Sequence, residues 1–203
     1  MYHQLATLQR SLIDLSLAEQ EIFALLQRKT PRKDIAADGT RFGDFEMDLV
    51  VDGYGHAILV LVERLTNFVM MEKLPFGKKA APLAKTVARM LYGYRKYLKT
   101  ITTDNGSEFA AHRDITAGLR IRGLPDVTVY FADSYCYWQK GAVEHENKLI
   151  HQYIPKKANF NDFSDQYIRN LAKELNRRPR KKLAFSTPKE EFFKQIAIFA
   201  LAN

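Results

Sequence analysis

Residues 43–51 read GDFEMDLVV, in which the apolar run Met47–Val51 predicts a strand that carries one carboxylate, Asp48. A carboxylate inside an apolar strand is costly unless another group compensates its charge. Asp44 lies in the same block and competes for the same role, but it precedes the apolar run. Asp48 is therefore the preferred candidate for a functional acid, although taken alone it fits a strand-end residue or an ion pair equally well.

The segments that follow this strand predict an α/β fold. Ala57–Val62 and Phe68–Leu74 are strand-like, and the turn signal DGYG at residues 52–55 indicates that the three strands form a meander. Thr100–Thr103 and Val127–Ala132 predict a fourth and a fifth strand. Helical spacing of apolar residues predicts helices from Leu83 to Leu98, over residues 111–122, 138–153 and 164–176, and from Thr187, where TPKE is a capping-box pattern.

Residues 1–40 are predicted to form a separate N-terminal segment. Apolar residues at three- to four-residue spacing predict one or two amphipathic helices over residues 1–28, and the basic stretch from Arg28 to Arg41 predicts a linker. Charged side chains interrupt the N-terminal apolar run, so we expect neither a signal peptide nor a membrane span. Residues 41–160 then form the main domain, and residues 161–203 form C-terminal helices.

The composition points to a polyanionic partner. Lys and Arg outnumber Asp and Glu by 31 to 23, which gives a net charge of +8 and a pI near 9.5. Nucleic acid is the first candidate for such a basic chain. Cys136 is the only cysteine, which excludes an internal disulfide and a multi-cysteine zinc site and fits a reducing compartment. The histidines, at positions that include His112, His145 and His151, show no zinc-ligand spacing.

Two further acids stand where a metal ligand is expected. Asp104 ends the fourth strand in TTDNGSEF, where Gly106 permits an unusual turn beside the carboxylate. Glu144 lies in a predicted helix that places Asn147, Lys148 and His151 on the same face, a suitable surface for metal and DNA phosphate together. Hard divalent ions prefer carboxylate oxygens. Each acid alone also fits a plain turn or a surface glutamate, so only their combination is informative.

In combination, three blocks resemble the DDE transposases and retroviral-type integrases, and the resemblance runs from about Arg41 to Phe193. The blocks are residues 43–49, 103–109 and 138–147, and residues 152–157 with 175–181 resemble the bacterial insertion-sequence family numbered thirty. The resemblance implies an RNase H-like core with a five-stranded mixed sheet, three strands antiparallel and two parallel, flanked by helices. It also implies metal-dependent nicking and joining of DNA at the ends of a mobile element.

The same resemblance assigns roles to single residues. It implies that Asp48, Asp104 and Glu144 form the catalytic triad and hold two ions of Mg²⁺ or Mn²⁺, which phosphoryl transfer needs to activate one oxygen and stabilise another. Residues expected to contact DNA are Asn147, Lys148, His151, Arg177, Arg178, Arg180 and Lys181. The basic cluster among them fits either a phosphate-tracking patch or a solvated surface. Expected partners are element-end and target DNA, a second copy of the chain, and a full-length transposase, in the bacterial cytoplasm at the nucleoid.

The sequence also departs from the family pattern. The loop at residues 123–126 lengthens the segment between Asp104 and Glu144, Ser134 stands where relatives tend to have proline, and Val143 replaces a more polar residue. About forty N-terminal residues are too few for the helix-turn-helix region of this family, which predicts a catalytic fragment, a split reading frame or a decayed copy. Two alternatives stay open: an inactive relic that binds DNA or dimerises with the full-length enzyme, and an RNase H-type nuclease that acts on hybrids.

Overall fold

The computed structural model describes residues 30–31, 39–132 and 140–202, and all of these except Thr30 belong to one compact unit, Pro31–Asn203. The helices predicted within residues 1–28 lie outside the described residues, as do Ser134, Cys136 and Trp138. The domain boundaries predicted at residues 40 and 160 stay predictions.

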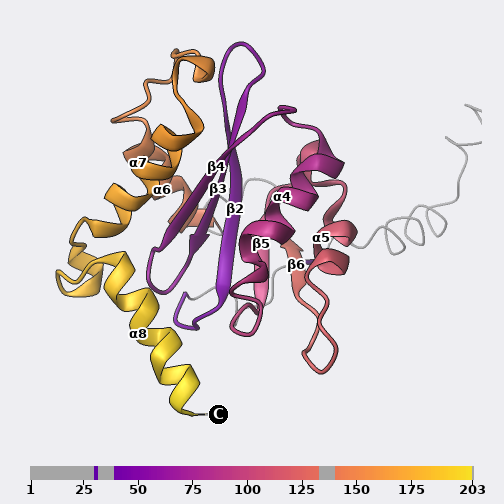
Figure 1. The fold of residues 1–203 in the computed structure, drawn as a ribbon, viewed down its shortest axis with the longest axis vertical. Coiled ribbons are helices and arrows are strands. Elements are labelled where there is room, and N and C mark those ends of the chain that lie inside the picture. Colours follow the sequence, from indigo (N-terminus) through magenta and orange to yellow (C-terminus); the bar gives the residue numbers. More distant parts are fainter. Residues whose placement is uncertain (1–29, 32–38, 133–139, 203) are drawn as a thin grey trace, which may run out of the picture. The chain divides into compact units, whose positions relative to one another are not determined.

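A mixed sheet forms the centre of this unit (Figure 1), and its strands follow the order β6-β5-β2-β3-β4. The antiparallel meander consists of β2 (Asp44–Val51), β3 (Ala57–Glu63) and β4 (Val69–Leu74), whereas β5 (Thr100–Thr103) runs parallel to β2 and β6 (Thr128–Phe131) runs parallel to β5. A two-residue strand, β1 (Thr30–Pro31), precedes them in the chain. The predicted RNase H-like sheet of three antiparallel and two parallel strands is confirmed.

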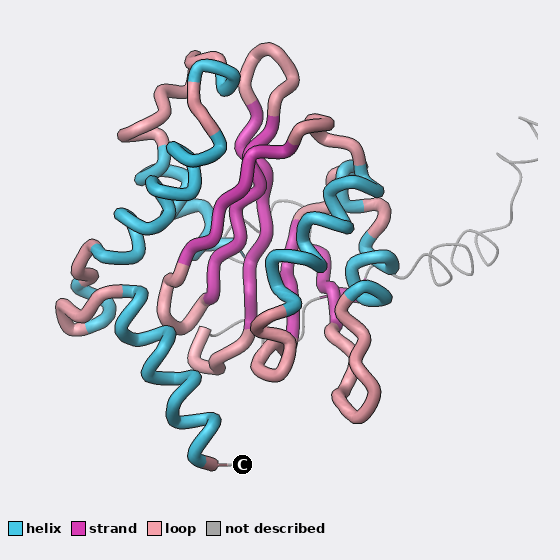
Figure 2. The backbone as a smooth tube through the Cα atoms, viewed as in Figure 1, coloured by secondary structure: helices cyan, strands magenta, loops and turns pink. Residues whose placement is uncertain are grey.

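Helices cover both faces of the sheet. They are α4 (Ala80–Tyr92), α5 (His112–Gly118), α6 (Gly141–Ile150), α7 (Asp165–Arg177) and α8 (Pro188–Leu201), with the short 3-10 turns η1 (Ser107–Phe109), η3 (Phe160–Asp162) and η4 (Lys181–Leu183). Figure 1 places α4 and α5 on one side of the strands and α6 and α7 on the other, and the tube in Figure 2 shows the same layers.

Three of the predicted helices are too long. The helix predicted from Leu83 to Leu98 ends at Tyr92, because the poor helix former Gly93 follows and the chain turns, although Leu98 still packs in the core. The helix predicted over residues 111–122 ends at Gly118, which is itself a poor helix former. Within the described part of the segment predicted at 138–153, the helix spans only Gly141–Ile150. Apolar residues in well-packed turns produced the apparent continuation of the helical pattern.

The alternation along β2 separates two apolar cores. Phe45 and Met47 pack with α4 and α5, whereas Val50 packs with residues of α6 and α7. Side chains two residues apart in a strand lie on the same face. The acidic residues of β2 therefore lie on the face that α6 and α7 cover.

The C-terminal helices are attached to the sheet by specific contacts. Thr187 forms the predicted capping box with Glu190 at the start of α8, and Phe192 from that helix stacks on Phe68 with ring centroids 4.2 Å apart. In α7, the amide of Asn176 donates to the carbonyl of Val69 at 2.7 Å and accepts from its N–H at 2.8 Å. This side chain thereby acts like a neighbouring strand for the edge strand β4.

Candidate active site

Asp44, Glu46 and Asp48 occupy every second position of β2 and lie on the face covered by α6. Each of the three has a different environment. Asp44 is buried, and Arg41 donates to both of its carboxylate oxygens, at 2.7 and 2.8 Å. The hydroxyl of Thr100 on β5 donates to Asp44 Oδ1 at 2.6 Å. These contacts commit Asp44 to joining β2 and β5, which favours Asp48 over Asp44 as the functional acid.

Glu46 positions α6 over the sheet. Its side chain is fully buried, accepts from Arg64 Nε at 2.6 Å, and accepts through its second oxygen from the backbone N–H of Val143 at 2.9 Å. The N–H groups in the first turn of a helix have no partner within the helix and attract a negative charge. The charge of Glu46 therefore holds the first turn of α6 directly above β2.

Asp48 and Asp104 meet at the carboxyl end of this arrangement. Lys140, which directly precedes α6, donates from Nζ to Asp48 Oδ1 and to Asp104 Oδ2, at 3.1 Å each. Burial lowers the pKa of Lys140, but the two carboxylates outweigh it and raise the pKa above its usual value. Asp104 also accepts from the N–H of Gly106 at 2.9 Å. Two acids far apart in the sequence thus share one cation.

Asn147 completes the immediate surroundings of Asp48. Its amide nitrogen donates to Asp48 Oδ2 at 2.8 Å, so each oxygen of that carboxylate has a different donor. The amide oxygen of Asn147 is buried without a hydrogen-bond partner. An amide oxygen without a partner belongs to the type of ligand that hard divalent ions bind.

Glu144 lies on the same side of α6 as these contacts. It stands one turn after Lys140 and one turn before Asn147, and both of those residues contact Asp48. Residues three and four apart share one face of a helix, so Glu144 is on the face directed toward Asp48. Its carboxylate is half-buried and makes no hydrogen bond or ion pair with the described residues. The structure therefore brings Asp48 and Asp104 together on Lys140, whereas Glu144 makes no hydrogen bond or ion pair with either aspartate.

The site fits a divalent cation in its donor chemistry. Two carboxylates already hold one cation, the Lys140 ammonium, and the oxygens of Asn147 and Glu144 are not used by other groups. Within residues 39–132 and 140–202, however, no three His, Cys, Asp or Glu side chains are close enough to form a metal cluster. The carboxylate and amide oxygens of these residues are nevertheless of the type that Mg²⁺ or Mn²⁺ prefers.

The residues expected to contact DNA fall into two groups. Lys148 is exposed on α6, and one turn later His151 Nδ1 lies 3.1 Å from the carbonyl oxygen of Ile154. Beyond α7, the side chains of Arg177, Arg178 and Lys181 are exposed.

Arg180 differs from its basic neighbours because it is largely buried. It forms an ion pair with the fully buried Glu146 of α6 at 2.9 Å. Burial raises the pKa of Glu146, an effect that the charge of Arg180 opposes. Arg180 therefore ties the C-terminal segment to α6.

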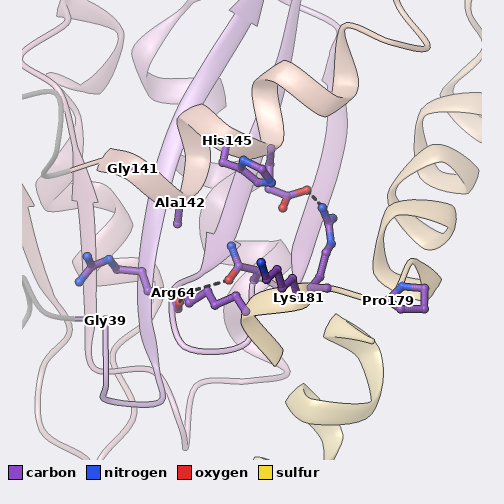
Figure 3. A pocket seen from close by; sticks show the side chains of 11 residues that line it. Gly39, Arg64, Gly141, Ala142, His145, Pro179 and Lys181 are labelled. Atoms are coloured by element: carbon purple, nitrogen blue, oxygen red, sulfur yellow. Dashed lines mark hydrogen bonds and ion pairs between the residues drawn. The ribbon is translucent and has the colours of Figure 1, made fainter. Parts of the chain in front are cut away.

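A basic pocket of about 470 Å³ lies beside the first turn of α6 (Figure 3). Arg64, Arg180, Lys181 and Lys182 supply its cationic groups, and His145 projects from α6. Lys182 donates to the carbonyl of Arg64 and to the side chain of Asn67, at 2.9 Å each. Burial lowers the pKa of Lys182, and so does the neighbouring charge of Arg64. Neither Asp48 nor Asp104 lines this pocket.

Comparison with known proteins gives one consistent result. The chain is 41% identical over 167 residues to the transposase of insertion sequence element IS4351 from Bacteroides fragilis, a match that covers 81% of this chain and 48% of the relative. It is 34% identical over 147 residues to the IS1086 transposase of Cupriavidus metallidurans, covering 72% and 42%. The transposase InsI of IS30A from Escherichia coli is 32% identical over 157 residues, covering 77% and 39%.

The chain is a homologue of IS30-family transposases. This result confirms the resemblance inferred from the three sequence blocks. The chain spans about half the length of the curated relatives it matches, or less. No family model matches the chain. Within the part of the chain that the structure describes, no helix is both long and apolar enough to cross a membrane.

Two residues that organise this site, Lys140 and Glu46, were not predicted from the sequence. Lys140 lies in the block at residues 138–147, but a lysine before a helix is common on protein surfaces, and its sequence alone indicates no role. Glu46 is two residues before Asp48 in the same strand, and this place on the same face is the signal for a buried acid that needs a partner.

Proposed function

We propose that this chain is a transposase catalytic core that nicks DNA and joins the freed 3′-hydroxyl to target DNA, with Asp48, Asp104 and Glu144 as the metal-binding acids. The observation that carries the proposal is the cation shared by Asp48 of β2 and Asp104 after β5, because two carboxylates from different strands converge on one positive charge. Homology to insertion-sequence transposases supports the reaction class.

Two ions of Mg²⁺ or Mn²⁺ would activate the attacking oxygen and stabilise the leaving one when bound. The side chains prepare this site before any ion arrives. Asn147 fixes the orientation of the Asp48 carboxylate, and the Gly106 N–H fixes that of Asp104. Glu46 holds the first turn of α6 above β2, so that Glu144 stays on the side of the helix that faces the two aspartates.

DNA binding is proposed for the surface that surrounds these acids. Lys148 and His151 continue the Glu144 face of α6 and are suited to the DNA end, and Asn147 contributes there through Asp48. The exposed cations Arg177, Arg178 and Lys181 are suited to phosphate contacts farther along the duplex, with Arg180 holding their segment in place through Glu146. We further propose that the active form is a dimer or larger assembly acting at the bacterial nucleoid.

The test is a nicking and strand-transfer assay on duplex DNA with Mg²⁺, Mn²⁺ or EDTA. Asp48→Asn, Asp104→Asn and Glu144→Gln should each abolish metal-dependent product while DNA binding in a gel shift survives. Asp126→Asn is the matched control, because Asp126 is an exposed acid in a surface ion pair. Strand-transfer activity retained in Asp48→Asn would refute the assignment.

The same assay separates the two alternatives. An inactive relic would give a salt-sensitive gel shift without cleavage under any metal condition. An RNase H-type nuclease would cleave an RNA–DNA hybrid in preference to a DNA duplex.

A further inference from the structure

We propose that Lys140 is a built-in counter-cation that competes with the divalent ion for Asp48 and Asp104, so that metal binding requires the Lys140 side chain to leave. This inference rests on the proposed metal-binding role of the two aspartates. It adds a positioning residue to the site and predicts an exchange of one cation for another as the first step of its assembly.

The ammonium group of Lys140 occupies the position of a cation bound between the two aspartates. Its side chain is largely buried, and its ammonium group lies 3.1 Å from an oxygen of each aspartate. Asp48 is reached from β2 and Asp104 from the turn after β5, so Lys140 joins two parts of the sheet. The ammonium therefore balances much of the negative charge that would otherwise draw a divalent ion into the site.

The two cations cannot use these carboxylates together without strong repulsion. The attraction of the carboxylates for a divalent ion is reduced by the positive charge already between them, and this effect is large where the groups are partly buried. Asn147 is different because it is a neutral donor and contacts the other oxygen of Asp48. Binding of the ion thus displaces Lys140 but leaves Asn147 in place.

The helix itself does not have to move for this exchange. Val143, in the first turn of α6, is anchored to the buried Glu46 through its backbone N–H, independently of Lys140. Lys140 stands just before the helix, and its long side chain can rotate while this anchor holds. Rotation of the lysine also removes the cation that lies between the two aspartates, so that the ion becomes the positive charge that attracts Glu144.

The experiment measures Mn²⁺ binding to the full chain without DNA, by electron paramagnetic resonance titration of free Mn²⁺. The variants are Lys140→Met, Lys140→Arg and Arg120→Met. Arg120→Met is matched in charge because it removes one cation from an exposed ion pair with Asp126. Lys140→Met should bind Mn²⁺ about tenfold tighter or more, a factor that corresponds to about 1.4 kcal/mol. Lys140→Arg and Arg120→Met should bind like the parent chain.

The melting temperature is a second measurement, which tests the inference even if Lys140→Met folds poorly. Without Lys140, the two aspartates repel each other, so Lys140→Met should melt at a lower temperature than the parent in EDTA and gain more from added Mg²⁺. Equal or weaker Mn²⁺ affinity of Lys140→Met, together with an unchanged response of its melting temperature to Mg²⁺, would overturn the inference.

Failure of the metal site itself gives a different pattern. If neither the parent chain nor Lys140→Met binds Mn²⁺, the proposed metal-binding role of the aspartates fails. If the parent binds Mn²⁺ and Asp48→Asn does not, while Lys140→Met equals the parent, only the role of Lys140 fails. Binding by Lys140→Met alone supports both.

Discussion

Asp52 offers the most direct test of the energetics of this fold. It begins the turn after β2, and its buried carboxylate accepts from the backbone N–H groups of Tyr54, His56 and Phe160 at 2.8 to 2.9 Å. The imidazole Nδ1 of His56 lies 2.7 Å from Oδ2 of the same carboxylate. Because Phe160 lies in η3, Asp52 links the tip of the β2–β3 hairpin to the segment that connects α6 with α7.

The magnitude follows from the pKa of this carboxyl group. Burial raises the pKa of Asp52, but the hydrogen bonds from Phe160, His56 and Tyr54 outweigh burial and lower it from 3.8 to about 2. Each unit of pKa corresponds to about 1.36 kcal/mol, so the ionised carboxylate contributes about 2 kcal/mol to the free energy of unfolding. Because the folded pKa is depressed, this contribution is complete above about pH 4 and is lost as the pH falls through about 2.

The perturbation is Asp52→Asn, measured by urea denaturation between pH 7 and pH 2. At neutral pH the variant should be less stable than the parent by about 2 kcal/mol or more, because the amide loses both the charge and one acceptor. The difference between the two chains should shrink by about 1 kcal/mol on reaching pH 3 and by about 2 kcal/mol on reaching pH 2. A difference that stays constant from pH 7 to pH 2 would refute the reasoning.

Three further predictions concern the anchors and the metal. Glu46→Gln should lower the free energy of unfolding by about 3–5 kcal/mol, because Arg64 loses a buried ionic partner, whereas Glu72→Gln at an exposed pair should cost about 1 kcal/mol or less in the same urea titration. Asn176→Ala should lower the free energy of unfolding by about 1–3 kcal/mol, since the backbone N–H and C=O of Val69 lose their partner. The amide hydrogen of Val69 should also exchange faster with solvent, and unchanged exchange would contradict the strand-like role of Asn176. EDTA should abolish nicking and leave the gel shift intact, so metal-independent nicking would argue against the proposed site.

Local sequence patterns determined most of the secondary structure. The five strands lie where alternation and turn signals predicted them, and the capping box at Thr187 begins α8 as expected. The ends of α4 and α5 were missed, because Leu98 and its neighbours pack as well from turns as from a helix. Periodicity reports which residues face a core, and it does not report whether the backbone between them is helical.

For the candidate acids, too, one part of the result came from the sequence and another part from the tertiary structure. The sequence by itself made Asp48, Asp104 and Glu144 the candidates, because the blocks that carry the family resemblance contain them and their local features are an apolar strand, a glycine turn and a helical face. Only the tertiary structure decided that Asp44 is committed to Arg41 and Thr100, that Glu46 holds α6, and that Lys140 lies between two aspartates. Partners of buried charges come from distant segments of the chain. Many lysines and arginines have similar local sequences, and only the folded chain brings one of them within hydrogen-bonding distance of a given carboxylate.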